Sequence, residues 1–381
     1  MAFIDFRSDS VTQPTDEMRQ AMAQAPVGDD FFGEDPSVIE LENYGASLTG
    51  KQAAIFVPSA TFANQLALFC HCNPGDEVII DENSHIVQKE SGAAALISGV
   101  NFRTFVPQNG VLCDDDLICR IRTGHEPGEP KTALICLENT MSCGNTIPLK
   151  QMQSMRYITA RYHVPVHLDG ARLFNAAASL NISAAEIAQN ADTVTLCLSK
   201  GLCAPAGGLL CGSKEFIEKA RQKRRLLGGE MHKVGGLAAA GLIGLKQMRQ
   251  CLVQDHETAF YLANSLTQFA EIEVDITRIE TNMVTFKFRE DNFETEAFED
   301  FFKHRNILLF GPNAQGTVKL YTHHWINKQH VDSFVKTLKE IKIDVKLDRT
   351  SYIIMHKNKF LTEINDNIEV KLGKGALECR V

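Results

Sequence analysis

Two side chains with complementary chemistry stand a short distance apart in the middle of the chain. Asp169 ends the apolar run VPVHLD, and Lys200 follows the apolar run TVTLCLS, 31 residues further on. A segment of that length holds one helix and one strand, so we expect both side chains at the ends of neighbouring parallel strands. A free Lys amine is a nucleophile toward carbonyl carbon, and a carboxylate can keep a ring nitrogen protonated.

A pyridoxal phosphate site needs this pair, because the amine forms a Schiff base with the cofactor and the protonated ring then accepts electrons. The spacing alone does not establish such a site. An Asp that caps a helix and a Lys at a solvated strand end would have the same spacing, and on spacing alone they are the more ordinary interpretation.

The runs around these residues predict a wound α/β sheet. Four apolar runs alternate with longer amphipathic segments, and they span residues 77–80, 131–138, 164–169 and 193–199. Apolar residues at consecutive positions are typical of parallel strands that helices cover on both faces. Since open parallel sheets bind ligands at the carboxyl ends of their strands, the polar endings at Glu138, Asp169 and Lys200 are the first candidates for a site.

The rest of the chain predicts a second, smaller domain. One helix is predicted from Ser213 to Leu227, and another long helix from about Gly236 to Asp255. Beyond them, the strand-like runs 284–288, 307–310 and 318–323 precede a helical stretch at 330–341, which is a pattern of α+β type. We therefore expect a large domain over residues 1–250, a small C-terminal domain over 251–345 and an extension of unassigned role over 346–381.

Composition excludes several classes of protein. The formal charge of −8 has the wrong sign for a protein that binds nucleic acid or anionic lipid. The longest apolar stretch, Val234 to Leu245, falls short of the roughly 18 residues that a membrane span needs. The eleven cysteines are odd in number and lie inside apolar runs, and Cys70, His71 and Cys72 are too closely spaced for a zinc finger. We expect a cytoplasmic globular protein with reduced thiols, no metal site and no membrane anchor.

Seven segments that occur in order connect this chain to a known family. They are RSDSVTQPT (7–15), VGDDFFGEDPSV (27–38), SHIVQKESGAAAL (84–96), ICLENT (135–140), PVHLDGARLFNAA (165–177), CLSKGLCAPAGGLLCGSKEFI (197–217) and DH (255–256). With them the chain closely resembles the L-threonine aldolases, of the aromatic amino acid β-eliminating lyase group of fold type I pyridoxal phosphate enzymes. The resemblance runs from about residue 3 to about residue 340. It implies an α/β fold type I architecture, in which a large domain with a mostly parallel sheet is joined to a small α+β domain.

Carried over position by position, the resemblance implies roles around the cofactor and the substrate. Lys200 would hold pyridoxal phosphate as a Schiff base, and Asp169 would pair with its pyridine nitrogen. His85 would lie against the ring and help with proton transfer, although on sequence alone it is equally an ordinary loop residue. Arg172 would lie at the cofactor and face the substrate carboxylate, which a planar guanidinium matches with two hydrogen bonds, and Ser8 would also contact substrate.

The cofactor's phosphate needs backbone N–H groups at the start of a helix. Ser59, Ala60 and Thr61 stand directly before an amphipathic run, although the same pattern is also an ordinary helix cap. The resemblance places Arg225 and His232 where the family sends basic residues across a subunit interface to that phosphate. The active site would then be shared in a homodimer or homotetramer.

Five residues depart from the family pattern. Near the phosphate, Ala60 stands where Gly is usual and His232 where Arg is usual. On the substrate side, Phe32 replaces a Tyr, Met141 replaces a His, and Lys319 replaces an Arg. Loss of a hydroxyl and an imidazole makes the expected pocket more apolar, and an ammonium lacks the two-pronged geometry of a guanidinium. We therefore expect a substrate with a bulkier or differently decorated side chain than that of threonine.

The implied reaction cleaves L-threonine or a related L-β-hydroxy-α-amino acid to glycine and an aldehyde. The base that takes the β-hydroxyl proton stays open among His85, His125 and an ordered water. One alternative is a pyridoxal phosphate-dependent β-eliminating lyase on a β-substituted amino acid, with Lys200 as the Cα base. Another is a cofactor-binding paralogue that has drifted from catalysis. The joint presence of Asp169, Arg172, Lys200 and His85 speaks against that last alternative.

Overall fold

The computed structural model describes residues 3–107, 112–124, 126–289 and 295–345. Internal contacts divide the chain into two units, Met1–Val331 and Asp332–Val381. The boundary expected near residue 250 therefore falls inside the first unit and stays a prediction, and the extension 346–381 lies outside the described residues. Within the described ranges, no helix is both long and apolar enough to span a membrane.

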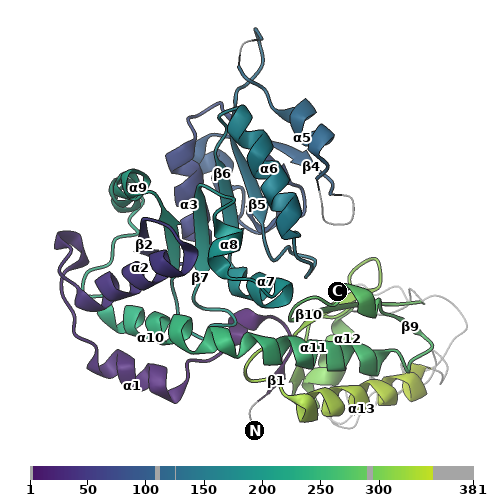
Figure 1. Ribbon diagram of the computed structural model, residues 1–381. Coiled ribbons are helices and arrows are strands. Elements are labelled where there is room, and N and C mark those ends of the chain that lie inside the picture. Colours follow the sequence, from purple (N-terminus) through teal and green to yellow (C-terminus); the bar gives the residue numbers. More distant parts are fainter. Residues whose placement is uncertain (1–2, 108–111, 125, 290–294, 346–381) are drawn as a thin grey trace, which may run out of the picture. The chain divides into compact units, whose positions relative to one another are not determined.

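A seven-stranded sheet forms the centre of the first unit (Figure 1). Its strands are β2 (Ala53–Val57), β3 (Glu77–Asp81), β4 (Asn101–Phe105), β5 (Thr132–Glu138), β6 (Val166–Gly170), β7 (Thr193–Cys197) and β8 (Gly208–Gly212). Their order is β2-β8-β7-β6-β5-β3-β4, and all neighbours are parallel except β8, which runs antiparallel to both β2 and β7. The predicted mostly parallel sheet and its four central strands are confirmed.

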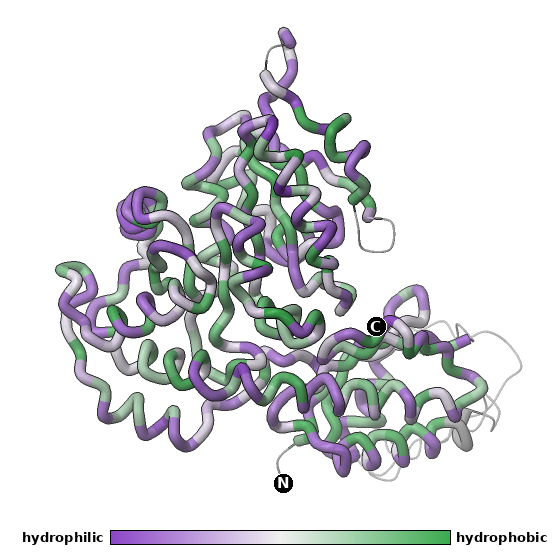
Figure 2. The backbone as a smooth tube through the Cα atoms, viewed as in Figure 1, coloured by the Kyte–Doolittle hydropathy of each residue, from purple (hydrophilic) through white to green (hydrophobic). Residues whose placement is uncertain are grey.

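Alternate residues of the strands enter different hydrophobic cores, so helices cover both faces of the sheet. In β8, Leu209 and Cys211 belong to one core, whereas Leu210 belongs to another with Leu66 and Ile217. The first core also holds residues of α2 (Pro36–Thr49), α5 (Asp114–Arg120), α6 (Leu149–Arg161), α7 (Leu173–Leu180), α8 (Ala184–Ala188) and α10 (Gly235–Lys246). The second lies under α3 (Ala60–His71) and α9 (Lys214–Leu226). The sheet is largely hydrophobic in Figure 2, while α9 is mostly hydrophilic.

Helix α9 confirms the helix predicted after Ser213, whose hydroxyl caps it by accepting from the N–H of Phe216 at 3.1 Å. The prediction of one long helix from Gly236 to Asp255 is wrong. Helix α10 ends at Lys246, a short 3₁₀ turn follows at Met248–Gln250, and α11 (Leu252–Leu266) begins anew. The two helices have different partners, since α10 packs on α1 (Asp16–Gln24) and α2 whereas α11 packs on α7 and β10, so the chain must turn between them.

Two small sheets follow in the first unit. Strands β12 (Thr317–Tyr321), β10 (Met283–Phe288) and β9 (Ile272–Glu273) form an antiparallel sheet, and β1 (Ile4–Asp5) pairs in parallel with β11 (Ile307–Leu308). Helix α12 (Thr295–Lys303) precedes β11, and α13 (Lys328–Val345) follows β12. The remaining elements are α4 (His85–Gln88), a π-helical turn at Ala94–Ser98, and 3₁₀ turns at Asp9–Val11, Asp30–Phe32 and Ile276–Arg278. The β1–β11 pair therefore joins the N-terminal segment to the C-terminal half.

One buried ion pair connects helix α9 to the N-terminal region. Arg224 is only 2% exposed, and its guanidinium donates to Asp30 Oδ2 at 2.6 Å and to the carbonyl of Phe56 at 2.7 Å. The pair Lys246–Glu40 offers a contrast, because both of its side chains are about half exposed. Desolvation makes the loss of one partner far more costly in the buried pair than in the exposed one.

We therefore expect Asp30→Ala to lower the free energy of unfolding by about 3–5 kcal/mol, since it leaves a buried guanidinium without its counter-ion. The matched variant Glu40→Ala should cost less than about 1 kcal/mol. Urea unfolding of both variants at one fixed protein concentration measures the difference. Equal urea midpoints for Asp30→Ala and Glu40→Ala would show that the ion pair of Asp30 with Arg224 contributes no more to stability than the exposed pair.

Candidate active site

The carboxyl ends of five strands meet at one edge of the central sheet. Because β8 is antiparallel to both β2 and β7, strand β2 points the same way as β7, β6, β5 and β3. The residues at or just beyond these ends are Ser59 after β2, Lys200 after β7, Asp169 in β6, Glu138 at the end of β5 and His85 after β3. The predicted gathering of polar strand endings at one edge is thus present.

Asp169 is held in one orientation. The residue is 2% exposed, and it pairs in register with Glu138 of the neighbouring strand. Its Oδ2 accepts from Asn64 Nδ2 at 2.7 Å, and its Oδ1 accepts from the backbone N–H of Ala171 at 2.9 Å. Asn64 lies on α3, so the helix above the sheet fixes the carboxylate.

Lys200 lies in a turn that the N-terminal segment holds in place. Its carbonyl accepts from Thr12 Oγ1 at 2.8 Å and from the N–H of Cys203 at 2.9 Å. Its side chain acts on Asp9: burial would raise the pKa of Asp9, but the charges of Arg172 and Lys200 and the hydrogen bonds to it lower that pKa overall. Arg172 therefore binds this buried carboxylate directly, and the charge of Lys200 acts on it as well.

Arg172 was expected to face the substrate carboxylate, and the structure shows that Asp9 already binds it. The guanidinium donates from Nε to Asp9 Oδ2 and from Nη2 to Oδ1, both at 2.7 Å. Asn282 Nδ2 also donates to Asp9, at 3.2 Å. Ser8 directly precedes Asp9, and its hydroxyl caps the turn Asp9–Val11 by accepting from the backbone N–H of Ser10. Asp9 was missed as a site residue, although it stands inside the quoted segment RSDSVTQPT.

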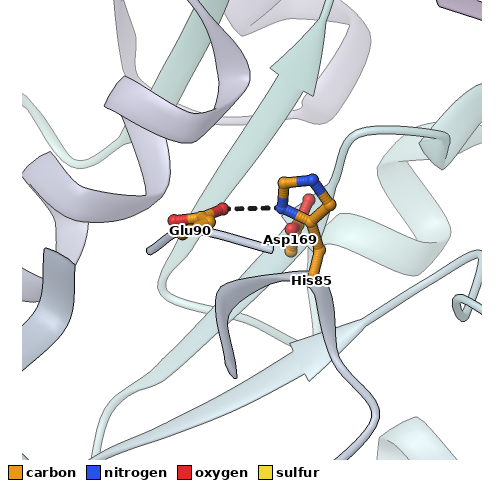
Figure 3. Close-up of side chains that lie close together, drawn as sticks. All are labelled: His85, Glu90 and Asp169. Atoms are coloured by element: carbon orange, nitrogen blue, oxygen red, sulfur yellow. Dashed lines mark hydrogen bonds and ion pairs between the residues drawn. The ribbon is translucent and has the colours of Figure 1, made fainter. Parts of the chain in front are cut away.

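His85 lies against Asp169 and a second acid. Its backbone N–H donates to Glu138 Oε2 at 2.6 Å, and its ring Nδ1 lies 2.9 Å from Glu90 Oε1. Figure 3 shows the imidazole and the Glu90 carboxylate facing each other beside Asp169. Side-chain nitrogen and oxygen atoms of these three residues lie within 4.8 Å of one another.

Three such residues could hold a metal ion, but the hydrogen bonds here favour another interpretation. Asn64 Nδ2 donates to Glu90 Oε1 at 3.0 Å as well as to Asp169. A cation between the two carboxylates would face the positive hydrogens of that amide. We therefore interpret the cluster as a hydrogen-bonded network. Sequence reasoning missed Asn64 and Glu90. For Asn64 the available signal was a polar side chain within the mostly apolar helix α3.

The sequence predicts for Glu138 only that it ends a strand at the candidate site. Burial and then the charge of Asp169 raise its pKa to about 7, although it accepts hydrogen bonds from Ser142 Oγ at 2.7 Å and from the backbone of His85. It is thus a carboxyl group that changes protonation near neutral pH. His125, the other histidine considered as a base, lies outside the described residues.

The start of α3 can receive an anion. The first N–H groups of a helix have no acceptor within the helix, and α3 is twelve residues long. Ser59 Oγ accepts from the N–H of Phe62, the third residue of the helix, at 3.0 Å, while Ala60 and Thr61 begin the helix. Strand β8 approaches closely here: a Cβ at Gly208 would lie 2.8 Å from the carbonyl O of Leu196 and 3.1 Å from the backbone N of Ala60. Glycine at that position therefore lets β8 lie close to both β7 and the helix start.

Three predicted site residues lie elsewhere on the single chain. Phe32 is 68% exposed, His232 Nδ1 lies 2.9 Å from Asp29 Oδ1, and Arg225 stacks over the ring of Phe31 at 4.1 Å. His232 and Arg225 contact Asp29 and Phe31, which lie close to Phe32 in the sequence, and these contacts do not involve the groups at the sheet edge. A role for them across a subunit interface stays a prediction.

Lys319 and Met141, two of the residues that depart from the family pattern on the substrate side, lie in different surroundings. Lys319 donates to the carbonyl of Ser142, and the ring of Tyr321 lies 5.1 Å from its ammonium and 5.4 Å from the guanidinium carbon of Arg172. Lys319 thus lies on the Arg172 side of the site. Met141, in contrast, is 5% exposed and belongs to the main hydrophobic core, so it does not line an open pocket.

Comparison with known proteins gives a consistent result. The family model of the beta-eliminating lyases matches residues 5–289. A probable low-specificity L-threonine aldolase 2 of Arabidopsis thaliana is 37% identical over 344 residues, which cover 89% of this chain and 97% of that protein. The low specificity L-threonine aldolase of Escherichia coli strain K12 is 37% identical over 329 residues, covering 86% and 96%.

Solved structures show the same fold at low sequence identity. A threonine aldolase of Leishmania major superposes with a TM-score of 0.75 at 19% identity, over 89% of this chain and 99% of that one. A structure described as SPT with a PLP internal aldimine gives 0.71 at 16% identity, over 91% and 89%. The match to the family model and the full-length relatives together establish that this chain belongs to the beta-eliminating lyases, on the threonine aldolase branch of these fold type I, pyridoxal phosphate-dependent enzymes.

Proposed function

We propose that this protein is a pyridoxal phosphate-dependent lyase that cleaves L-threonine or a related L-β-hydroxy-α-amino acid to glycine and an aldehyde. The observation that carries the proposal is the gathering of polar groups at one sheet edge: Asp169 and Arg172 lie at or just beyond the end of β6, and Lys200 follows the neighbouring strand β7. The proteins that match this chain over nearly their full length are named low-specificity L-threonine aldolases, and their names support this reaction.

The groups at this edge fit the cofactor. The Lys200 amine would bind its aldehyde carbon, the Asp169 carboxylate would face its pyridine nitrogen, and the first N–H groups of α3 would take its phosphate. Gly208 has no Cβ that would crowd the backbone N of Ala60, one of the N–H groups that an anion at this helix start would meet. When bound, the protonated cofactor ring supplies a sink for the electrons of the bond that breaks.

The remaining groups bind the substrate and move protons. Asp9 accepts from Nε and from one N–H of Nη2 of Arg172, so the second N–H of Nη2 and those of Nη1 are the donors that would meet a substrate carboxylate. This bidentate pair also fixes the plane of the guanidinium, so that a second carboxylate meets a preoriented donor. Lys319 adds a positive charge on the same side, beyond the ring of Tyr321.

The exposed groups Phe32, Arg225 and His232 support a proposal about assembly. A basic residue and an aromatic one that have no place at their own chain's sheet edge can serve the site of a second copy. We propose that the protein forms a homodimer or homotetramer with shared active sites. A cytoplasmic location stays a prediction.

A substrate panel on purified, cofactor-loaded protein tests the reaction. We expect glycine and the matching aldehyde from β-hydroxy amino acids, with phenylserine-like substrates turned over faster than threonine because Phe32 makes its part of the pocket more apolar. Pyruvate and ammonia from serine or cysteine derivatives, without aldol cleavage, would favour β-elimination instead. Threonine turned over well above phenylserine would contradict the preference for a bulky side chain.

Lys200→Ala tests the covalent attachment. We expect this variant to lose the yellow absorbance of the bound cofactor and the mass gained on borohydride reduction, because no other amine would stand at that carbon. Lys246→Ala, which removes an exposed amine far along α10, should keep both signals. An unchanged spectrum in Lys200→Ala would remove Lys200 from the mechanism.

Lys319→Arg tests the carboxylate side of the site. A guanidinium can bind a carboxylate through two parallel hydrogen bonds, so we expect a several-fold lower KM for threonine with little change in kcat. Steady-state kinetics of the variant and the wild type on the same substrates measure both constants. A raised KM would mean that Lys319 is matched to another group, such as the Ser142 carbonyl that it binds in the structure.

A further inference from the structure

Glu90 is a buried acid that none of the roles above uses. The residue is 3% exposed and its side chain is fully covered. Its carboxylate accepts three hydrogen bonds: Oε1 lies 2.9 Å from His85 Nδ1 and 3.0 Å from Asn64 Nδ2, and Oε2 lies 2.6 Å from Gln65 Nε2. A carboxylate so buried and so fully bonded holds its partners in defined positions.

The amide of Asn64 can point only one way. Its Nδ2 meets the two carboxylates of Glu90 and Asp169, while its Oδ1 lies 3.2 Å from Nε2 of His167. Burial lowers the pKa of His167 to about 4, so this imidazole is neutral and carries one proton. That proton is on Nε2, because the carbonyl oxygen of Asn64 accepts, and Thr193 Oγ1 can donate to Nδ1 at 3.0 Å.

The same reasoning determines the proton position on His85. An ionised carboxylate only accepts hydrogen bonds, so the His85 ring must carry its proton on Nδ1, which faces Glu90. With its single proton on Nδ1, the ring has its lone pair on Nε2. Glu138 holds the backbone of His85 at 2.6 Å, so both ends of the residue are fixed, and about a third of its side chain stays exposed at the sheet edge.

We propose that Glu90 is the positioning residue that sets the tautomer of His85 and so makes its Nε2 the proton acceptor of the cleavage. This inference rests on the proposed function. Glu90 itself touches neither substrate nor cofactor and acts through the imidazole. When Nε2 takes the β-hydroxyl proton, the ring becomes a cation whose charge the Glu90 carboxylate balances, as the acid of a catalytic triad does for its histidine.

Glu90→Gln tests the proposal, because it removes the charge and keeps the size. Long-range ¹H–¹⁵N spectra of ¹⁵N-histidine-labelled holoenzyme report the proton position, with the His85 signals identified by their loss in His85→Gln. We expect a single Nδ1–H tautomer in the wild type and a mixture in Glu90→Gln, since an amide can donate or accept. We also expect kcat to fall about 10- to 100-fold with KM within about threefold, and the acidic limb of the pH profile to move to lower pH.

Two further variants serve as controls. Glu90→Asp keeps the carboxylate and should restore the Nδ1–H tautomer and most of kcat. Glu77→Gln changes an equally buried acid at the opposite end of β3, where Arg122 binds it, and should leave the tautomer and kcat as in the wild type. A loss of activity in Glu77→Gln as large as that in Glu90→Gln would assign the effect to lost packing and overturn the proposal.

The inference and the proposed function fail in different ways. An active wild type whose Glu90→Gln variant keeps the single tautomer and kcat would overturn the role of Glu90 alone. A second result is also possible: the wild type cleaves no β-hydroxy amino acid, and the His85 tautomer still differs between the wild type and Glu90→Gln. That result would overturn the proposed function and, with it, the role of His85 as proton acceptor. The tautomer measurement needs no turnover, so it separates the two.

Discussion

The constraint on which the proposed cofactor site depends is the shared direction of β2, β7, β6, β5 and β3. Hydrogen-bonded strands lie about 4.8 Å apart, so residues distant in sequence become neighbours when their strands pair in register. Glu138 and Asp169 are such a pair. Strand β8, inserted between β2 and β7 in the opposite direction, keeps the end of β2 at the same edge. The start of α3 therefore faces the same space as Lys200 and Asp169.

The charges gathered at this edge are buried, and the fold balances them in two ways. Asp9 and Arg172 neutralise each other by a bidentate ion pair, so that neither buried charge lacks a counter-ion. Other acids keep their protons instead: burial, helped by the charge of Asp9, raises the pKa of Asp255 to about 8. A protonated Asp255 spares the buried Asp9 carboxylate a second negative charge beside it.

A layer of polar side chains under α3 stiffens the site from below. His167 and Asp169 point to the same face of β6, because they alternate with Val166 and Leu168, which enter the core on the other face. Thr193 Oγ1 joins His167 to His71, seven residues after Asn64 on α3. Burial lowers the pKa of His71 to about 3, so this layer stays uncharged. Asp169 thus rests on neutral, bonded groups that hold it in place.

What the sequence by itself determined was the repeating strand pattern, the polar strand endings and the places of Asp169 and Lys200 at the ends of neighbouring strands. Those features are local, because apolar periodicity and the residue that ends a strand are set within a few positions. Only the tertiary structure decided that Asp9 binds Arg172, that Glu90 binds His85 and that Met141 lies in the core. These contacts join residues from separate elements, and the break after Lys246 likewise arises because α10 and α11 pack on different partners. Which side chains meet depends on how whole elements pack, and no local pattern carries that information.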